Sequence, residues 1–141
     1  MSESSFLDGL YHRDIITLAR RGRDRGRLDA ADRSARADNP LCGDRVTMDL
    51  DLDNDRIARI GHRVRGCALC EAAAEIIAEE AVGVTESEVA AVRSALQDYL
   101  GGESGDPLWE QLKIFAPVSR VPSRHECVLL AFDAVLRALK S

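Results

Sequence analysis

Aromatic residues, long apolar runs and a surplus of basic residues are scarce or missing in this chain of 141 residues. Its 19 lysines and arginines are outnumbered by 24 acidic residues, and the net charge of −5 argues against general affinity for nucleic acid or anionic membranes. No stretch approaches a membrane-spanning helix, and the N-terminus lacks the basic-then-apolar run of a secretory signal. We therefore expect a cytoplasmic protein with no nucleic-acid partner and no membrane partner.

The motifs of common enzyme classes are also missing. The chain has no Gly-x-Ser-x-Gly, no phosphate-binding loop and no well-spaced histidine–carboxylate pair, so ordinary hydrolase and transferase sites find no support. Apolar residues make up 45% of the chain, which is enough for one domain with a hydrophobic core. We expect a single domain over residues 1–141.

The chemistry of the chain is concentrated in four cysteines. In a reducing compartment, cysteines act as ligands, nucleophiles or small buried residues more often than as disulfides. They lie in three turn-like segments, namely Asn39 to Asp44 with Cys42, Arg65 to Cys70 with Cys67, and Ser123 to Cys127. We predict that the fold brings these segments together around one metal or sulfur site.

Strict alternation predicts a β-hairpin between the first two segments. Apolar and polar residues alternate over 45–52, and after a turn at 53–55 the alternation resumes over 58–64, so the two strands should pair antiparallel. The predicted apolar face consists of Val46, Met48, Leu50, Leu52, Ala58, Ile60, His62 and Val64. For the histidine we favour a hydrogen-bonded core or edge position over a metal ligand.

Apolar residues at three- and four-residue spacing predict helices elsewhere. The first covers 6–19 with Phe6 and Leu7 in its stripe, and the next follows Gly66 and ends at Gly83. Further helix starts are predicted at the capping box Thr85–Glu88, at Asp106-Pro107, whose helix would bury Leu108, and at a capping box formed by Ser123 and Glu126.

Seven arginines crowd residues 20–36, interleaved with aspartates and glycines. One interpretation is a solvated loop and polar edge segment whose charges pair locally. The other is a docking surface for an acidic protein partner. Nucleic-acid binding is disfavoured, because no aromatic residues interleave with the arginines to stack on bases.

The positions of the cysteines suit metal binding. Cys67 falls at a predicted helix N-terminus and Cys127 in the first turn of another helix, where the helix dipole, Arg65 and Arg124 should lower both thiol pKa values. Cys42 and Asp44 should point to the same side of the chain. Three thiolates and one carboxylate form a suitable tetrahedral zinc shell. Spacing alone leaves a second interpretation open, in which the cysteines are scattered buried residues.

Read in order, the motifs resemble those of the NifU/IscU-type iron–sulfur cluster assembly proteins. The most specific block is Asn39-Pro40-Leu41-Cys42-Gly43-Asp44, and the others are Leu10-Tyr11 to Ile16, Arg23 with Gly26 and Leu28, Gly66-Cys67-Ala68-Leu69, and Pro122-Ser123-Arg124 with Cys127. The long segment between Cys67 and Cys127, together with Glu126 where an IscU-type protein has histidine, resembles the SufU branch.

The resemblance implies a small α+β fold, with a three-stranded antiparallel sheet and helices packed on one side. It implies that Cys42, Asp44, Cys67 and Cys127 are metal ligands, holding zinc in the SufU branch or a transient [2Fe–2S] cluster in scaffold members. It further implies that Cys42 accepts persulfide sulfur from a SufS-like cysteine desulfurase. Apo iron–sulfur proteins or other SUF components would be the further partners.

Two departures from the family pattern leave questions open. Residues 18–24 replace the family's His-x-x-Asn-Pro-Arg-Asn run, which puts the partner contacts of that loop in question. Cys70 stands where serine is common, and one helical turn from Cys67 it is a buried bystander, an auxiliary thiol or substitute ligand, or a redox partner of Cys67.

Three functions therefore compete. The first is a sulfur acceptor or scaffold for iron–sulfur cluster assembly, which needs Cys42 to be movable. The second is a non-catalytic zinc-binding interaction module, in which Cys42→Ala would unfold the protein. The third is a dithiol redox protein, in which Cys70→Ser would abolish activity and Cys42 would be dispensable.

Overall fold

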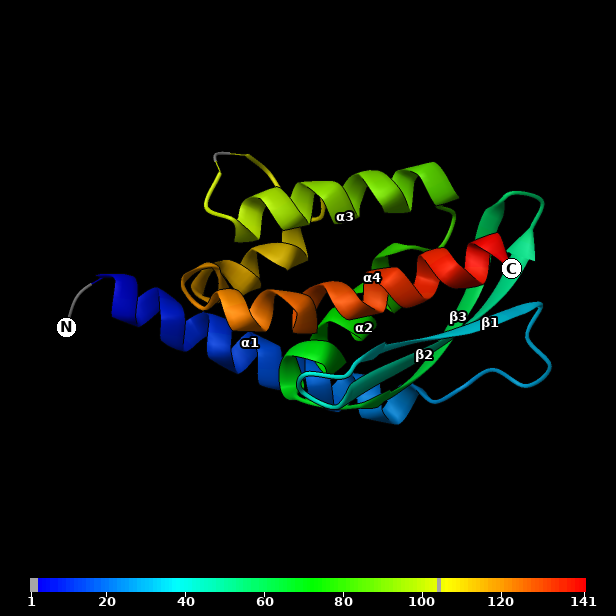
Figure 1. Cartoon of the computed structure of the whole chain (residues 1–141), viewed down its shortest axis with the longest axis horizontal. Coiled ribbons are helices and arrows are strands. Elements are labelled where there is room, and N and C mark those ends of the chain that lie inside the picture. Colours follow the sequence, from blue (N-terminus) through cyan, green and yellow to red (C-terminus); the bar gives the residue numbers. More distant parts are fainter. Residues whose placement is uncertain (1–2, 104) are drawn as a thin grey trace.

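The computed structural model describes residues 3–103 and 105–141, with side chains from residue 9 onward (Figure 1). Its elements, in chain order, are α1 (Glu3–Arg25), β1 (Arg33–Asn39), β2 (Asp44–Asp53), β3 (Arg56–Arg65), α2 (Ala68–Glu80), α3 (Glu86–Leu100), the 3-10 helices η1 (Glu110–Arg120) and η2 (Pro122–Arg124), and α4 (His125–Lys140). The predicted stripe residues Phe6 and Leu7 lie outside the described side chains. Among the described residues, no helix is both long and apolar enough to cross a membrane.

The three strands form an antiparallel meander in the order β1-β2-β3, with β2 in the centre. Helix α4 packs across β1 and β2, α2 contacts β3, and α1 and α3 flank the inner helices (Figure 1). The core lies between the sheet and these helices, where Val46, Met48 and Leu50 are fully buried. The expected α+β architecture and the predicted hairpin are therefore confirmed.

Within the hairpin, one register shift changes which residues face the core. A bulge lies between Asp51 and Leu52, so Ile57 becomes buried and Ala58, predicted to face inward, is exposed. The bulge places one extra residue against the partner strand and shifts the alternation by one position. Past the bulge, the predicted hydrogen-bonded core position of His62 is confirmed. Its side chain is buried, and its Nε2 lies 3.1 Å from Glu75 Oε1.

The arginine-rich segment 20–36 differs from the predicted loop. Helix α1 continues through residue 25, and residues 33–39 form the edge strand β1. The prediction of local charge pairing is wrong for most of it. The principal ion pairs join distant elements and are Arg21–Glu79, Arg23–Glu71, Arg25–Glu75 and Arg27–Asp49. These arginines therefore pair with carboxylates on α2 and β2 and not with the aspartates next to them in the sequence.

Helix starts and ends are confirmed in part. Thr85 caps α3 by accepting a hydrogen bond from the backbone N–H of Glu88. Helix α2 ends at Glu80, before the predicted Gly83. Asp106 does not start a helix: its carboxylate accepts from the N–H of Leu108, whose side chain is exposed, and η1 begins only at residue 110.

The second predicted capping box is absent. Among the described residues, the N-cap position of α4 is Arg124, which makes no side-chain capping hydrogen bond. The turn η2 precedes α4 directly, so the chain enters the helix through a tight 3-10 turn and Ser123 does not cap it. Cys127 still falls in the first turn of α4, as the sequence predicts.

Two glycines let α1 and the loop after it lie close against the rest of the fold. A Cβ at Gly22 would come within 3.3 Å of both Glu75 Cβ and His62 Cε1. A Cβ at Gly61 would lie 2.6 Å from the backbone nitrogen of Leu28. These approaches fix α2 against α1 and β3, and thereby position the N-terminus of α2.

Candidate metal centre

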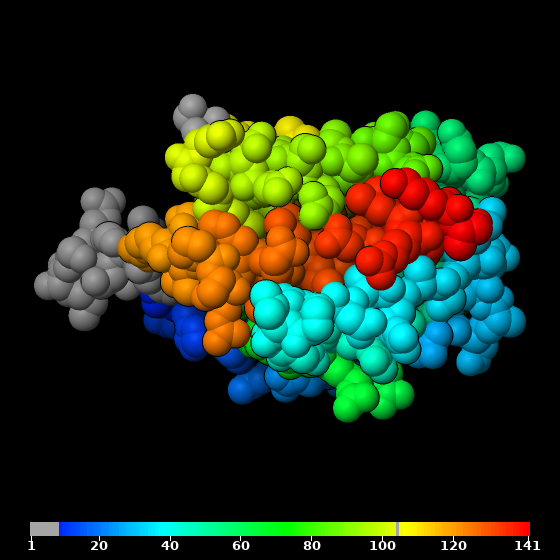
Figure 2. Space-filling model, viewed as in Figure 1, coloured from blue at the N-terminus to red at the C-terminus, as the bar shows by residue number. Residues whose placement is uncertain are grey.

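A tight turn presents Cys42 at the surface. Residues 40–43 join β1 to β2, and the N–H of Gly43, at a φ of 72°, donates to the carbonyl of Asn39 across 2.9 Å. Leu41 at the tip is 97% exposed, and Cys42 beside it is exposed. Figure 2 shows this cyan turn on the surface next to the orange segment that leads into α4. Cys42 is therefore the one exposed cysteine of the four.

Asp44 is the first residue of β2 and faces inward from that turn. Its Oδ2 accepts hydrogen bonds from the thiol of Cys42 at 3.0 Å and from that of Cys70 at 3.2 Å. Burial raises the pKa of this carboxyl, but the thiol hydrogen bonds outweigh burial and hold the pKa below its usual value. The side chains of Cys42 and Asp44 therefore lie on the same side of the chain, as predicted.

Gly66 makes room for this carboxylate, and the sequence reasoning did not identify that role. A Cβ at position 66 would lie 2.6 Å from Asp44 Oδ1 and 2.9 Å from its Cγ. Any side chain there would displace Asp44 from the cysteines. The only sequence signal was the Gly-Cys pair itself, which does not reveal what lies opposite the glycine.

Helix α2 and its N-cap supply two of the four thiols, Cys67 and Cys70. Cys67 is its N-cap residue, half exposed, and its Sγ lies 4.0 Å from Asp44 Oδ2. The pKa of Cys67 is lowered to about 5, first by a hydrogen bond from the Cys70 thiol and then by the N–H groups of Cys70 and Leu69, against burial. The predicted lowering of the Cys67 pKa is confirmed, although its largest cause is the Cys70 thiol and the N–H groups of the helix N-terminus come second.

Cys127 completes the group from α4. It is buried, and its Sγ lies 3.9 Å from that of Cys42. The prediction of a lowered pKa for this thiol is wrong. Burial and the neighbouring Asp44 and Cys67 raise its pKa to about 12, because they outweigh the helix dipole. Arg124 donates to Cys127, and this contact raises the pKa of the guanidinium.

The structure thus brings together the four cysteines and the carboxylate that the sequence singled out. One ligand atom from each of Asp44, Cys67, Cys70 and Cys127 lies within 4.8 Å of the others, and Cys42 contacts this group through Asp44 and Cys127. Three or four sulfurs with one carboxylate form a donor set that suits zinc or an iron–sulfur cluster, whereas magnesium and calcium prefer oxygen. The residues therefore fit such a metal.

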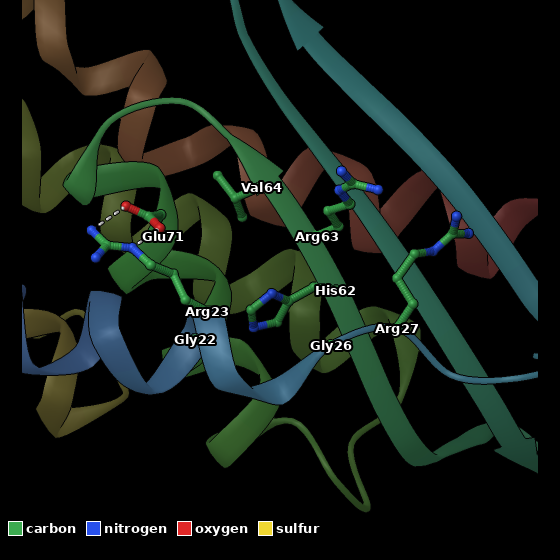
Figure 3. Close-up of a pocket in the computed structure, with 8 residues that line it drawn as sticks. All are labelled: Gly22, Arg23, Gly26, Arg27, His62, Arg63, Val64 and Glu71. Carbon is green, nitrogen blue, oxygen red and sulfur yellow. Dashed lines mark hydrogen bonds and ion pairs between the residues drawn. The ribbon is translucent and has the colours of Figure 1, made fainter.

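Ion pairs beside the site hold the first turn of α2. Arg23 contacts Glu71, the residue after Cys70, at 2.6 Å, and this pair lines a cavity of about 390 Å³ between α1 and β3. Figure 3 shows the pair at one end of the cavity and His62 pointing from β3 toward Gly22. The other described histidine near the site, His125, has its Nε2 3.0 Å from the carbonyl of Val118.

A group of thiols around one carboxylate, on a small α+β scaffold, is the arrangement of a thiol-based site that could hold a metal ion. The NifU-like N terminal domain matches residues 10–141, and the chain belongs to this family.

Relatives carry related names. The chain is 26% identical over 139 residues to the iron–sulfur cluster assembly scaffold protein IscU of Streptococcus pyogenes serotype M1, covering 96% of this chain and 86% of the relative. It is 25% identical over 137 residues to the zinc-dependent sulfurtransferase SufU of Bacillus subtilis, with 96% and 92% covered.

A solved structure agrees in fold. A putative iron–sulfur cluster assembly scaffold protein for the SUF system, from Fervidobacterium islandicum AW-1, superimposes with a TM-score of 0.81 at 25% identity, covering 89% of this chain and 93% of that one. The resemblance read from the motifs is confirmed by the family match and by this structure.

Proposed function

We propose that this chain is an iron–sulfur cluster assembly protein, which accepts sulfur from a cysteine desulfurase on Cys42, scaffolds a nascent [2Fe–2S] cluster in the same pocket, or does both. The observation that carries the proposal is the asymmetry of the thiol group. Cys42 is exposed on a turn, while Cys70 and Cys127 are buried beneath it. One thiol is thus available to a partner, and the others remain inside.

The proposed ligands are Cys42, Asp44, Cys67 and Cys127, with Cys70 and Arg124 as auxiliary residues. Zinc is the metal that the thiol-rich donor set and the similarity to SufU support. When bound, zinc keeps coordinating thiols deprotonated at neutral pH. Arg124 provides a positive charge next to Cys127 and so offsets part of the anionic charge of the ligands.

In the proposed transfer, the thiolate of Cys42 attacks the outer sulfur of a persulfide on the desulfurase. A bond forms between Cys42 Sγ and that sulfur, the sulfur–sulfur bond of the donor breaks, and the desulfurase cysteine leaves as a thiolate. The turn at 40–43 presents Cys42 to the donor, and the exposed Leu41 offers an apolar contact beside it. When Cys42 is protonated, its thiol donates a hydrogen bond to Asp44 Oδ2 across 3.0 Å.

The proposed setting is a single domain over residues 1–141, acting in the cytoplasm. A SufS-like cysteine desulfurase would be the sulfur donor, and apo iron–sulfur proteins or other SUF components would receive the product. The net charge of −5 is consistent with protein partners and not with nucleic acid.

The test measures metal and acid-labile sulfide in protein purified without tags or chelators, for wild type and Cys42→Ala. Persulfide on each protein is then measured after incubation with a cysteine desulfurase and cysteine. We expect zinc without sulfide for a sulfur acceptor, and iron with matching sulfide for a scaffold, with persulfide formation lost in a folded Cys42→Ala.

Two results would contradict the proposal. Unfolding of Cys42→Ala on removal of this exposed thiol would favour the structural zinc module. Full sulfur transfer by Cys42→Ala, together with its loss in Cys70→Ser, would favour the dithiol redox protein.

A further inference from the structure

The site contains one more thiol than a four-coordinate metal needs. Three thiols and one carboxylate complete a tetrahedral shell. The structure offers four thiols, and the four ligand atoms that lie mutually within 4.8 Å belong to Asp44, Cys67, Cys70 and Cys127. Cys42 is outside this closest set, although it contacts Asp44 and Cys127.

Cys70 faces this set and not only the core. Its side chain is 0% exposed, and its thiol lies 3.2 Å from Asp44 Oδ2 and 3.1 Å from the carbonyl oxygen of Cys127. On α2 it stands one turn after Cys67, so both sulfurs project from the same side of the helix. A bystander would have apolar neighbours only, whereas Cys70 contacts the carboxylate at the centre of the group.

Cys42 and Cys70 differ in how freely they can move. Cys42 lies in the turn beyond Asn39 and Asp44, the last pair of the β1–β2 ladder, so its displacement breaks no strand pairing. Cys70 is held within α2, whose first turn is anchored by the Arg23–Glu71 ion pair. The movable thiol and the fixed thiol contact the same oxygen, Asp44 Oδ2.

We propose that Cys70 is a reserve metal ligand, which takes the place of Cys42 when Cys42 leaves the metal. The two ligand sets contain three thiolates and one carboxylate each, so the charge of the shell is the same before and after the exchange. The proton that Cys70 loses on binding is released to solvent, so Cys42 leaves the metal as the thiolate that the proposed transfer uses, and Asp44 Oδ2 is within hydrogen-bond reach of both thiols. The role of this exchange in sulfur transfer rests on the proposed function. The existence of the second ligand set does not depend on that function.

The first experiment is a double-mutant cycle on zinc affinity with Cys42→Ser, Cys70→Ser and both together, measured by competition with a chromophoric chelator. Cobalt(II) replaces zinc in parallel samples, because its thiolate charge-transfer band grows with the number of bound thiolates. We expect each single variant to keep one metal per chain and a three-thiolate band. The double variant should lose one thiolate from the band and more than about 100-fold in affinity.

The matched control is Ala72→Ser, which puts a hydroxyl at another fully buried position of α2. This variant should leave the zinc affinity and the cobalt(II) charge-transfer band unchanged. It therefore separates the loss of a ligand from a general disturbance of the helix. If Cys42→Ser alone already loses a thiolate and the affinity, and adding Cys70→Ser changes neither further, then Cys70 is not a ligand and the proposal is overturned.

In a second experiment the decisive measurement is made on the wild-type protein. Zinc-loaded wild type is treated with iodoacetamide until Cys42 is alkylated, and the retained zinc is measured. We expect one zinc per chain to remain, while the same treatment of Cys70→Ser or Cys70→Ala releases the metal. Loss of zinc from alkylated wild type would overturn the proposal even if the Cys70 variants fail to fold.

Neither experiment involves sulfur transfer, so the two proposals fail separately. If wild type accepts no sulfur from a desulfurase but the cycle gives the expected coupling, the proposed function fails and the reserve ligand stands. If sulfur transfer occurs and the coupling is absent, the reserve ligand fails alone.

Discussion

Gly66→Ala tests whether the position of Asp44 controls metal binding. The new Cβ would lie 2.6 Å from Asp44 Oδ1, whereas ordinary contacts begin at 3.4 Å, so the oxygen must retreat by about 0.8 Å. The Cγ and Cβ of Asp44 would lie at 2.9 and 3.1 Å, so the whole short side chain must move and not only its tip. The φ of Gly66 is not positive, so alanine adds no backbone strain there.

Displacement of the carboxylate should weaken metal binding without unfolding the protein. We expect zinc affinity to fall by about 10- to 100-fold, because Asp44 Oδ2 is the atom that contacts Cys42 and Cys70. The cost of the added methyl group to the free energy of unfolding of the metal-free protein should be about 1–3 kcal/mol. Chelator competition measures the first quantity and urea unfolding the second.

The control is Gly9→Ala, in α1, where a Cβ would meet nothing within 4 Å. It should leave zinc affinity unchanged and raise stability by about 0.5–1 kcal/mol through helix propensity. If folded Gly66→Ala binds zinc within twofold of wild type, then the location of the Asp44 carboxylate does not govern the site and the reasoning is refuted.

Three further outcomes are expected. Gly61→Ala should lower the free energy of unfolding by about 3 kcal/mol or more, because its Cβ would lie 2.9 Å from the carbonyl oxygen of Gly26, a backbone atom that cannot retreat; a urea midpoint equal to that of wild type would contradict this. Burial opposes ionisation of Glu75, but its hydrogen bonds lower its pKa from 4.5 to about 2, so its contribution of about 3 kcal/mol is present above pH 4.5 and is lost as the pH falls towards 2. Urea unfolding between pH 5 and 2 should show a shallower loss of stability in Glu75→Gln than in wild type, and identical slopes would argue against the pairing. Leu41→Ser should leave the free energy of unfolding within about 0.5 kcal/mol of wild type. It should raise the desulfurase concentration for half-maximal sulfur loading of Cys42 by about 30-fold, equivalent to about 2 kcal/mol of lost apolar contact. Unchanged loading kinetics would exclude Leu41 from the contact with the desulfurase.

Local patterns predicted those parts of the fold in which neighbours along the chain decide the outcome. The alternation over 45–52 predicted the hairpin, which the strand pairing confirms. The capping box at Thr85 predicted the helix cap, which is present as a hydrogen bond from the backbone N–H of Glu88 to the Thr85 side chain. Where one extra residue enters a strand, alternation fails: the bulge at Asp51 exposes Ala58. A bulge depends on how two strands meet, and the composition of either strand does not reveal it.

Long-range charge pairs were beyond the reach of the sequence. Arg21 and Glu79 are 58 residues apart, and Arg23 and Glu71 are 48 apart, so neither pair has a local signature. The sequence offered arginines interleaved with aspartates, which suggested a solvated loop and polar edge segment with local charge pairs, or a docking surface. Because α1 packs on α2, several of these arginines pair with carboxylates of the helix that contains Cys70 and begins after Cys67.

The sequence by itself determined the residue types of the candidate site, because Cys42, Asp44, Cys67 and Cys127 stand in motifs whose thiols and carboxylate suit a metal. Only the tertiary structure decided which thiols meet and how each ionises. It placed Cys70 against Asp44, and it raised the pKa of Cys127, for which the helix dipole had suggested the opposite. The physical reason is that burial and contacts between distant segments set the environment of a thiol, whereas the sequence specifies only its immediate neighbours.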